Sequence, residues 1–202
     1  MRTALNANGF LYLAVLLLLN VSCQQSKDSI VAPAPPADNL LYTDLTGKEV
    51  KPGGVVTLDL NKDGIQDFIF ETQLVGDAVY RLDKVQYLIA SGVDSYLPIN
   101  DQESMARFNK GDEIPLNDFN GFFWYKISSN VLVQKVISET KPSYWEGNWK
   151  ASNHHFLPVQ VYKNEKRFVG WIEISVDTVA EKLVLHKAAL STIPERSVKA
   201  GS

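Results

Sequence analysis

Residues Phe168–Val176 read Phe-Val-Gly-Trp-Ile-Glu-Ile-Ser-Val, and this stretch decides the fold class. Apolar side chains recur at every second position: one side would carry Phe168, Gly170, Ile172 and Ile174, and the other Val169, Trp171, Glu173 and Ser175. Because successive side chains of a β-strand point to opposite sides, a period of two is typical of a strand with at least one buried face. We therefore expect an extended strand here.

The chain from Leu40 onward continues in the same way, with short β-branched and aromatic runs separated by Gly, Asn, Asp and Pro. Such runs predict strands, at Val55–Leu60, Phe68–Thr72, Ala78–Leu82, Lys84–Ala90, Phe122–Ile127, Val131–Ile137, Leu157–Tyr162, Phe168–Val176 and Lys182–Ala188. Many short strands at near-regular spacing favour an all-β fold, a single jelly-roll-like β-sandwich of about eight to ten strands. A barrel is the alternative.

Turn and helix signals complete this prediction. Hairpin turns are expected at Asn164-Glu165 and at Asp177–Ala180, because these residue types favour tight turns. Helix signals are weak. We expect one or two helical turns at Ser104–Lys110, which Gly111 ends.

The composition of the 202-residue chain excludes several classes of protein. Hydrophobic residues make up 45%, and 9 Phe, 8 Tyr and 4 Trp supply enough apolar surface for a core, which excludes disorder throughout. The single cysteine excludes a disulfide framework. The formal charge of -3, from 23 Asp and Glu against 20 Lys and Arg, argues against a dedicated nucleic-acid binder.

Residues 1–22 have the pattern of a signal peptide. The apolar run Phe10–Leu19 spans about 15 Å as a helix, half the thickness of the hydrocarbon layer, so it is too short to cross a membrane. Ser22 precedes Cys23, and this ending resembles the lipobox of bacterial lipoproteins, although Asn20 stands where that motif usually has Leu. An ordinary secretory signal followed by an unmodified cysteine is the alternative.

The lipobox resemblance implies that Cys23 receives diacylglycerol on its sulfur, that the signal is cut before it, and that the new amine is acylated. Gln24 rather than Asp follows the cysteine, so the resemblance implies anchoring in the cell outer membrane, facing the periplasm or the surface. We then expect residues 23–38 to form a Pro-rich tether, residues 39–192 the sandwich and residues 193–202 a flexible tail.

The segment Leu58–Phe68, Leu-Asp-Leu-Asn-Lys-Asp-Gly-Ile-Gln-Asp-Phe, is the most specific motif in the chain. Calcium prefers oxygen ligands, and alternate residues of a tight loop aim their oxygens inward. Gly64 permits the sharp turn. We expect loop 59–67 to bind a structural calcium ion through the side chains of Asp59, Asn61, Asp63 and Asp67, the last directly or through water, and through the Ile65 carbonyl.

The loop is not an EF-hand, because position 12 holds Phe70 instead of Glu and the flanking segments are expected to be strands. It resembles the Asp-x-Asn-x-Asp-Gly-x-x-Asp loops of dockerin-like, thrombospondin-type-3 and integrin-like FG-GAP proteins. The alternative is a hairpin turn at Asp63-Gly64 with solvated acids around it. Magnesium suits the loop less well than calcium, because it dehydrates reluctantly.

Two blocks resemble a broad group of bacterial secreted and surface proteins. They are Val55–Glu71 around the loop and the block that begins at Phe168–Val176 and ends near Leu190, with the turn Gly111–Ile114 between them. The group includes the amino-terminal domains of PEP-CTERM-type proteins and surface lipoproteins of the Bacteroidetes type. The resemblance implies a calcium-loop β-sandwich at the cell surface. It implies no reaction, because the group has no common activity.

Candidate catalytic groups are few. A transition-metal site at His154 and His155 is not expected, because adjacent residues of a strand point to opposite faces and one ion would rarely bind both. His186 lies 31 residues beyond His155. No Gly-x-Ser-x-Gly elbow is present in the chain. The acids considered for glycosidase chemistry are Glu139, Glu146 and Glu173, for which solvated surface charge is the simpler explanation. We therefore expect that the protein has no catalytic residues and is not an enzyme.

Aromatic residues beside polar loops indicate a glycan-binding surface. Trp124, Tyr144 and Trp145 have Asn, Ser, Gly and Lys nearby, which suits sugar stacking, while core packing is the alternative. The leading expectation is a non-catalytic, calcium-stabilised, lipid-anchored envelope protein of structural or adhesive type, with the membrane and another envelope protein as partners. A carbohydrate-binding lipoprotein for glycan capture is the second expectation, and a secreted hydrolase the third.

Overall fold

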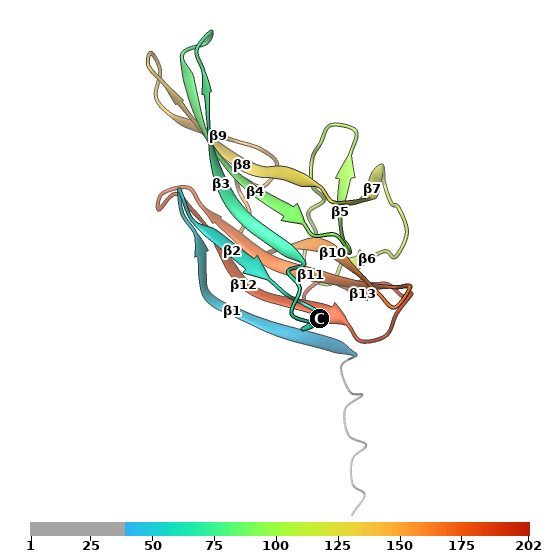
Figure 1. Ribbon diagram of the computed structural model, residues 1–202. Coiled ribbons are helices and arrows are strands. Elements are labelled where there is room, and N and C mark those ends of the chain that lie inside the picture. Colours follow the sequence, from blue (N-terminus) through green and yellow to red (C-terminus); the bar gives the residue numbers. More distant parts are fainter. Residues whose placement is uncertain (1–38) are drawn as a thin grey trace, which may run out of the picture. The chain divides into compact units, whose positions relative to one another are not determined.

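The computed structural model describes residues 39–202, which form two large antiparallel β-sheets and a third of two strands (Figure 1). The six-stranded sheet has the order β1 (Leu40–Val50), β12 (Lys182–Ser191), β11 (Lys166–Asp177), β10 (His155–Lys163), β5 (Ser95–Asn100) and β7 (Phe122–Lys126). The five-stranded sheet has the order β2 (Val55–Leu58), β3 (Phe68–Asp77), β4 (Leu82–Ser91), β8 (Ser129–Ser138) and β9 (Tyr144–Glu146). The predicted all-β sandwich is confirmed, with two open sheets instead of a closed barrel.

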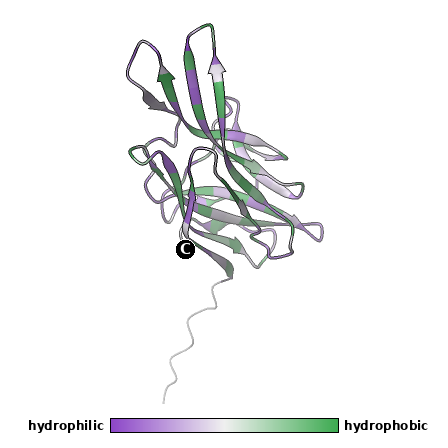
Figure 2. Cartoon of the chain, turned by 60° about the vertical axis from the view of Figure 1, so that its left-hand side comes forward, coloured by the Kyte–Doolittle hydropathy of each residue, from purple (hydrophilic) through white to green (hydrophobic). Residues whose placement is uncertain are grey.

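Apolar side chains from both sheets meet in one core between them. The five-stranded sheet contributes Phe68, Phe70 and Ile89, and the six-stranded sheet contributes Leu157, Ile172 and Leu185. Figure 2 shows hydrophobic segments alternating with hydrophilic ones in the strands of both sheets. Burial of these side chains from water is the main term that holds the sheets together, at about 25 cal/mol for each Å² of apolar surface.

A second apolar cluster covers the outer face of the six-stranded sheet. Trp171 on β11 is buried there, with its ring centroid 5.2 Å from that of Phe156 on β10. Val169 belongs to the same cluster, whereas Ile172 and Ile174 face the core between the sheets. The alternation predicted for Phe168–Val176 is therefore confirmed, and this part of β11 is buried on both sides.

Two predicted elements are wrong. The predicted strand Ala78–Leu82 is instead the turn between β3 and β4 at residues 78–81, and only its Leu82 lies in a strand. Asp77 Oδ1 holds this turn, because it accepts hydrogen bonds from the N–H groups of Val79 and Tyr80, both at 3.1 Å. Ser104–Lys110 forms no helix. Its Phe108 instead exchanges two backbone hydrogen bonds with Phe156, at 2.9 and 3.0 Å, as an isolated bridge to the six-stranded sheet.

Both predicted hairpin turns are confirmed. Asn164 and Glu165 have φ values of 50° and 60° and join β10 to β11, where Lys163 pairs with Lys166. At the other turn, Asp177 Oδ1 accepts N–H bonds from the two following turn residues, Val179 at 3.0 Å and Ala180 at 2.8 Å. At the second turn, the Asp177 side chain thus accepts N–H bonds that no neighbouring strand accepts.

The carboxyl-terminal segment differs from the flexible tail expected at residues 193–202. Val198–Lys199 forms β13, which pairs with β6 (Glu113–Ile114) in a two-stranded sheet. Val198 and Ala200 are buried in the second apolar cluster. This packing could not be predicted from the sequence, because it depends on only two small apolar side chains, Val198 and Ala200, in a polar segment.

The predicted signal peptide, Cys23 and the tether lie outside the described residues. Within residues 39–202, no helix is long and apolar enough to cross a membrane. The first strand of the described part is β1, which begins at Leu40 (Figure 1).

Candidate metal centre

The predicted calcium loop joins β2 to β3, and both of its ends are fixed by the sheet. Leu58 pairs with Phe68 in the antiparallel ladder, and the Asp67 N–H donates to the Leu58 carbonyl at 2.8 Å. Leu58, Leu60 and Phe68 are all buried in the core between the sheets. The loop forms here because buried apolar residues on both sides hold its ends, while the polar residues between them stay near the surface.

Asp67 is the buried acid of this loop, with only 4% of its surface exposed. Its Oδ2 accepts hydrogen bonds from the N–H groups of Leu60 at 2.7 Å and Asn61 at 3.3 Å, and its Oδ1 accepts one from Ser95 Oγ at 3.2 Å. Burial raises the pKa of Asp67 and the nearby Asp59 charge adds to this, although the three hydrogen bonds act in the opposite direction. A carboxylate in this environment is stabilised by a neighbouring cation.

The exposed half of the loop is held together by its own polar side chains. Asp59 accepts hydrogen bonds from the N–H groups of Asp63 at 3.2 Å and Gly64 at 2.8 Å. Asn61 Oδ1 accepts one from the Asp63 N–H, and Asp63 Oδ1 accepts one from the Ile65 N–H, each at 2.9 Å. These side chains therefore turn toward the backbone of one loop.

Gly64 makes the bend with φ of +87°, a conformation that residues with a side chain adopt at a cost. A Cβ placed there would meet no atom within 4 Å, so the reason for glycine is conformational and not steric. Lys62 and Gln66 are exposed, as the motif predicts for residues between ligands. The turn predicted at Gly64 is confirmed.

The binding of a calcium ion to this loop stays a prediction. Within residues 39–202, no three His, Cys, Asp or Glu side chains are grouped as ligands of one metal ion. The loop carboxylates bond to backbone N–H groups, and Asp63 Oδ2 lies 3.9 Å from Lys163 Nζ. Glu71 lies on β3, paired with Val55, and not in the loop. The donor set of three carboxylates, one amide and one carbonyl nevertheless fits the oxygen chemistry of calcium.

No family model, curated protein or solved structure matches the chain. The lipoprotein and PEP-CTERM resemblances therefore remain predictions from the residues quoted above.

The three aromatic residues predicted to bind glycan lie on two different sheets. Trp124 is on edge strand β7, where its Nε1 donates to the Asn117 carbonyl at 3.3 Å. Tyr144 and Trp145 are on edge strand β9. Tyr144 is 46% exposed, whereas Trp145 packs against Tyr87 with ring centroids 5.8 Å apart. Trp124 and the β9 pair therefore belong to separate surfaces.

The three acids considered for glycosidase chemistry each have a different neighbour. Glu139 follows β8 and lies 3.9 Å from Arg81. Glu146 accepts a hydrogen bond from the Gln134 side chain, and Glu173 Oε1 lies 2.7 Å from His154 Nδ1. They come from the end of β8, from β9 and from β11. The structure brings no two of them into contact with each other.

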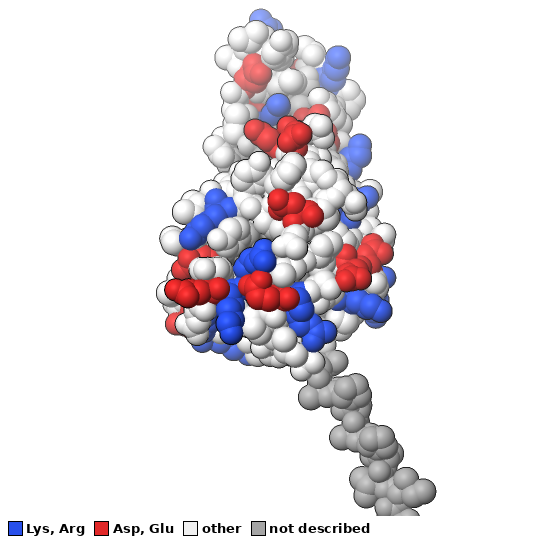
Figure 3. Space-filling model, turned by 90° about the vertical axis from the view of Figure 1, so that its right-hand side faces the viewer, with Lys and Arg blue, Asp and Glu red and all other residues white. Residues whose placement is uncertain are grey.

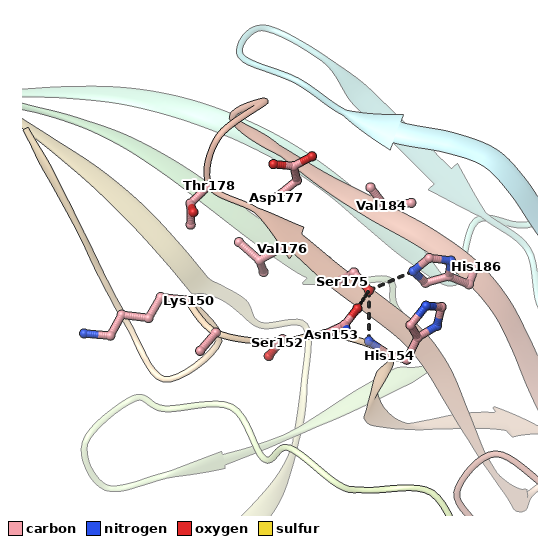
Figure 4. A pocket seen from close by; sticks show the side chains of 11 residues that line it. Lys150, Ser152, Asn153, His154, Ser175, Val176, Asp177, Thr178, Val184 and His186 are labelled. Carbon is pink, nitrogen blue, oxygen red and sulfur yellow. Dashed lines mark hydrogen bonds between the residues drawn. The ribbon is translucent and has the colours of Figure 1, made fainter.

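The sequence did not predict one cluster of polar side chains, which contains two histidines. His154 and His186 stack on each other with ring centroids 4.1 Å apart (Figure 4). The two histidines are 32 residues apart in the chain, and this spacing carries no sign of their contact. The alternation in β11, which places Glu173 and Ser175 on the outer face of the sheet, was the signal that polar partners would be found there.

Proposed function

We propose that this chain is a non-catalytic, calcium-stabilised protein of the cell envelope, of structural or adhesive type and lipid-anchored through Cys23. The observation that carries the calcium part is Asp67, a buried carboxylate that closes a loop containing Asp59 and Asp63. A divalent cation bound to these acids offsets both the burial of Asp67 and its repulsion by Asp59. The ion's role is stability, because the loop ties adjacent strands instead of lining a deep cleft.

The position of the loop explains how one ion stabilises the sandwich. Asp67 joins the loop to Leu60 in the core and to Ser95 at the start of β5, so its carboxylate links the two sheets. Gly92 adds a link between the loop and the β4–β5 connection, because its N–H donates to the Asp67 carbonyl at 2.7 Å. A ligand that binds only the folded state raises stability by about 2.7 kcal/mol at a concentration of 100 times Kd.

The decisive test is thermal unfolding of the full chain with calcium and with a chelator. We expect calcium to raise the Tm of the wild type and to have little effect on the Tm of Asp59→Asn, which keeps one of the two N–H acceptors of Asp59 but loses its charge. Glu139→Gln is a matched control, since Glu139 is an exposed acid that lies 3.9 Å from Arg81, at the end of the five-stranded sheet opposite to the loop. The calcium proposal is wrong if chelation of calcium-loaded protein leaves Tm unchanged.

The envelope location has its own test. Mass spectrometry of the processed chain from a bacterial host should show diacylglycerol and an acyl chain on Cys23, and Cys23→Ser should release the protein from membranes. The surface in Figure 3 shows acidic and basic side chains interspersed, without a large patch of one sign. This face therefore offers no charged patch for attachment to a membrane surface.

A glycan-binding role is the second candidate, favoured by an aromatic hollow of about 390 Å³ beside Trp124. Phe119 stacks on Phe122 at 5.6 Å and lies 6.0 Å from Trp124. Phe119 and Phe122 line the hollow with the polar residues Arg107, Asp112, Asn120 and Asn148. Ring faces with nearby amides suit a sugar. A glycan array that shows binding by the wild type and loss in Phe119→Ala would support this role, and an array without hits would contradict it.

A further inference from the structure

Two histidines from distant parts of the chain meet on the outer face of the six-stranded sheet (Figure 4). His154 lies in the loop before β10, and His186 lies on β12. Their ring centroids are 4.1 Å apart and their planes differ by 28°. They border an open hollow of about 520 Å³ that Asn153 and Ser175 also line. The pair is accessible, because the His154 side chain is 56% exposed.

The backbone places both rings by departing from regular structure. Glu173 on β11 pairs with Lys187, whereas Ile174 pairs with Leu185, so His186 is the extra residue of a β-bulge. A bulge redirects a side chain that would otherwise follow the alternation of the strand, and bulges are frequent beside functional sites. His154 has φ of +52°, and its N–H donates to Ser175 Oγ at 2.9 Å. Two local irregularities thus bring the imidazoles together.

One nitrogen of each ring is already held by a protein oxygen. His154 Nδ1 lies 2.7 Å from Glu173 Oε1, and His186 Nε2 lies 2.9 Å from Ser175 Oγ. Within residues 39–202, His154 Nε2 and His186 Nδ1 make no hydrogen bond. In metal sites, the nitrogen that does not bind the ion is usually held by a carboxylate, a carbonyl or another oxygen, which fixes the ring and its tautomer.

We propose that His154 Nε2 and His186 Nδ1 bind one divalent transition-metal ion, of which Zn²⁺ is the probe of choice, with Glu173 and Ser175 as positioning residues. Imidazole nitrogen suits Zn²⁺, Ni²⁺ and Cu²⁺, whereas the oxygen-rich loop at Asp59 suits calcium. Two histidines leave coordination positions for water, and the adjoining hollow provides the space for it. The site is separate from the calcium loop and does not depend on it.

The stacked geometry sets one requirement for binding. An imidazole lone pair lies in the plane of its ring, so two nearly parallel rings must tilt before both point at one ion. The exposed His154 ring is the one that moves, while His186 stays fixed by its strand and by Ser175. Zinc therefore replaces the ring stack with a chelate that joins the 147–154 loop to β12.

The test is zinc binding to the full chain in excess calcium, with any affinity-tag histidines removed. Calorimetry measures stoichiometry and affinity, and ¹⁵N NMR of the imidazoles identifies the nitrogens that bind. We expect one Zn²⁺ per chain and large shifts of His154 Nε2 and His186 Nδ1 in the wild type. Affinity should fall at least about tenfold in His154→Gln and in His186→Gln, and about tenfold in Glu173→Ala.

His155→Gln is the matched control, because His155 lies on β10 and its Nδ1 accepts the Asn153 N–H at 3.0 Å instead of facing the pair. It should bind zinc as the wild type does. The proposal is overturned if the wild type shows no imidazole shift at zinc concentrations well above that of the protein. It is equally overturned if the shifts arise at His155, or if His186→Gln binds zinc unchanged. The NMR result on wild type decides the matter even where a variant fails to fold.

Discussion

The Asp67 carboxylate accepts a hydrogen bond from the Ser95 hydroxyl at 3.2 Å, and this contact joins the predicted calcium loop to β5 of the other sheet. Both residues are buried, Asp67 to 4% exposure and Ser95 to 1%. A change in the charge of Asp67 therefore alters the hydrogen bond that joins the two sheets. The protonation and metal binding of this loop bear on the stability of the whole sandwich.

The first prediction concerns Asp67→Asn in metal-free protein. Burial raises the pKa of Asp67, so the folded state holds its proton more tightly than the unfolded state. The stability of the wild type therefore falls as pH rises from about 3.8 through the folded-state pKa, and Asn removes this decline. Asn also keeps an acceptor for the Leu60 N–H. Urea unfolding in chelator at several pH values should show a variant at least as stable as wild type at neutral pH.

The same variant should lose most of its response to calcium, since the buried ligand charge is gone. This loss distinguishes a metal ligand from a buried acid that merely weakens the fold. A calcium-induced rise in Tm equal to that of the wild type would contradict the assignment of Asp67 as a ligand.

The second prediction compares two glycines with the same backbone strain. Gly64 has φ of +87° and Gly53 has φ of +79°, and a Cβ at either position would meet no atom within 4 Å. Alanine in this region costs about 1–2 kcal/mol at each site. Chemical denaturation without calcium should therefore show similar losses for Gly64→Ala and Gly53→Ala. Only Gly64→Ala should also weaken calcium binding, and equal calcium affinity in both would place the ion elsewhere.

The third prediction is a loss of stability at mildly acidic pH that involves His155. Burial lowers the pKa of His155, and the Arg107 charge adds to this. The unfolded state then binds a proton that the folded state does not, so stability is lost as pH falls below about 6.5 toward the folded-state pKa. His155→Asn keeps an acceptor for the Asn153 N–H without titrating. Its stability should change less between about pH 7 and about pH 5 than that of the wild type.

The fourth prediction tests the carboxyl-terminal segment. Ala200 is fully buried in the second apolar cluster, and its N–H donates to the Asp112 carbonyl at 2.9 Å. Ala200→Asp places an unpaired charge there and should lower the free energy of unfolding by about 3 kcal/mol or more. Lys199→Asp, at an exposed neighbour, is the control and should change it little. Equal stability of the two variants would mean that the segment does not pack in solution.

Much of the fold could be predicted because it depends on local pattern. Alternating apolar residues identified β11, and the run Val55–Glu71 identified two strands around a polar loop. The turn at Asn164-Glu165 was also readable, since its backbone preference is local. One of the failures also has a local cause. Ala78–Leu82 has the composition of a strand, but the Asp77 side chain caps a turn there.

The sequence by itself determined the all-β class, the bend at Gly64 and the row of acids in its loop, because each follows from the period of side chains or from the conformational freedom of one residue. Only the tertiary structure decided that Asp67 is buried against Ser95, that Ala200 is packed and that His154 meets His186. These contacts join residues far apart in the chain, and they follow from sheet order, register and a bulge in β12. Local pattern specifies strands, whereas the packing of two sheets specifies which of their side chains meet.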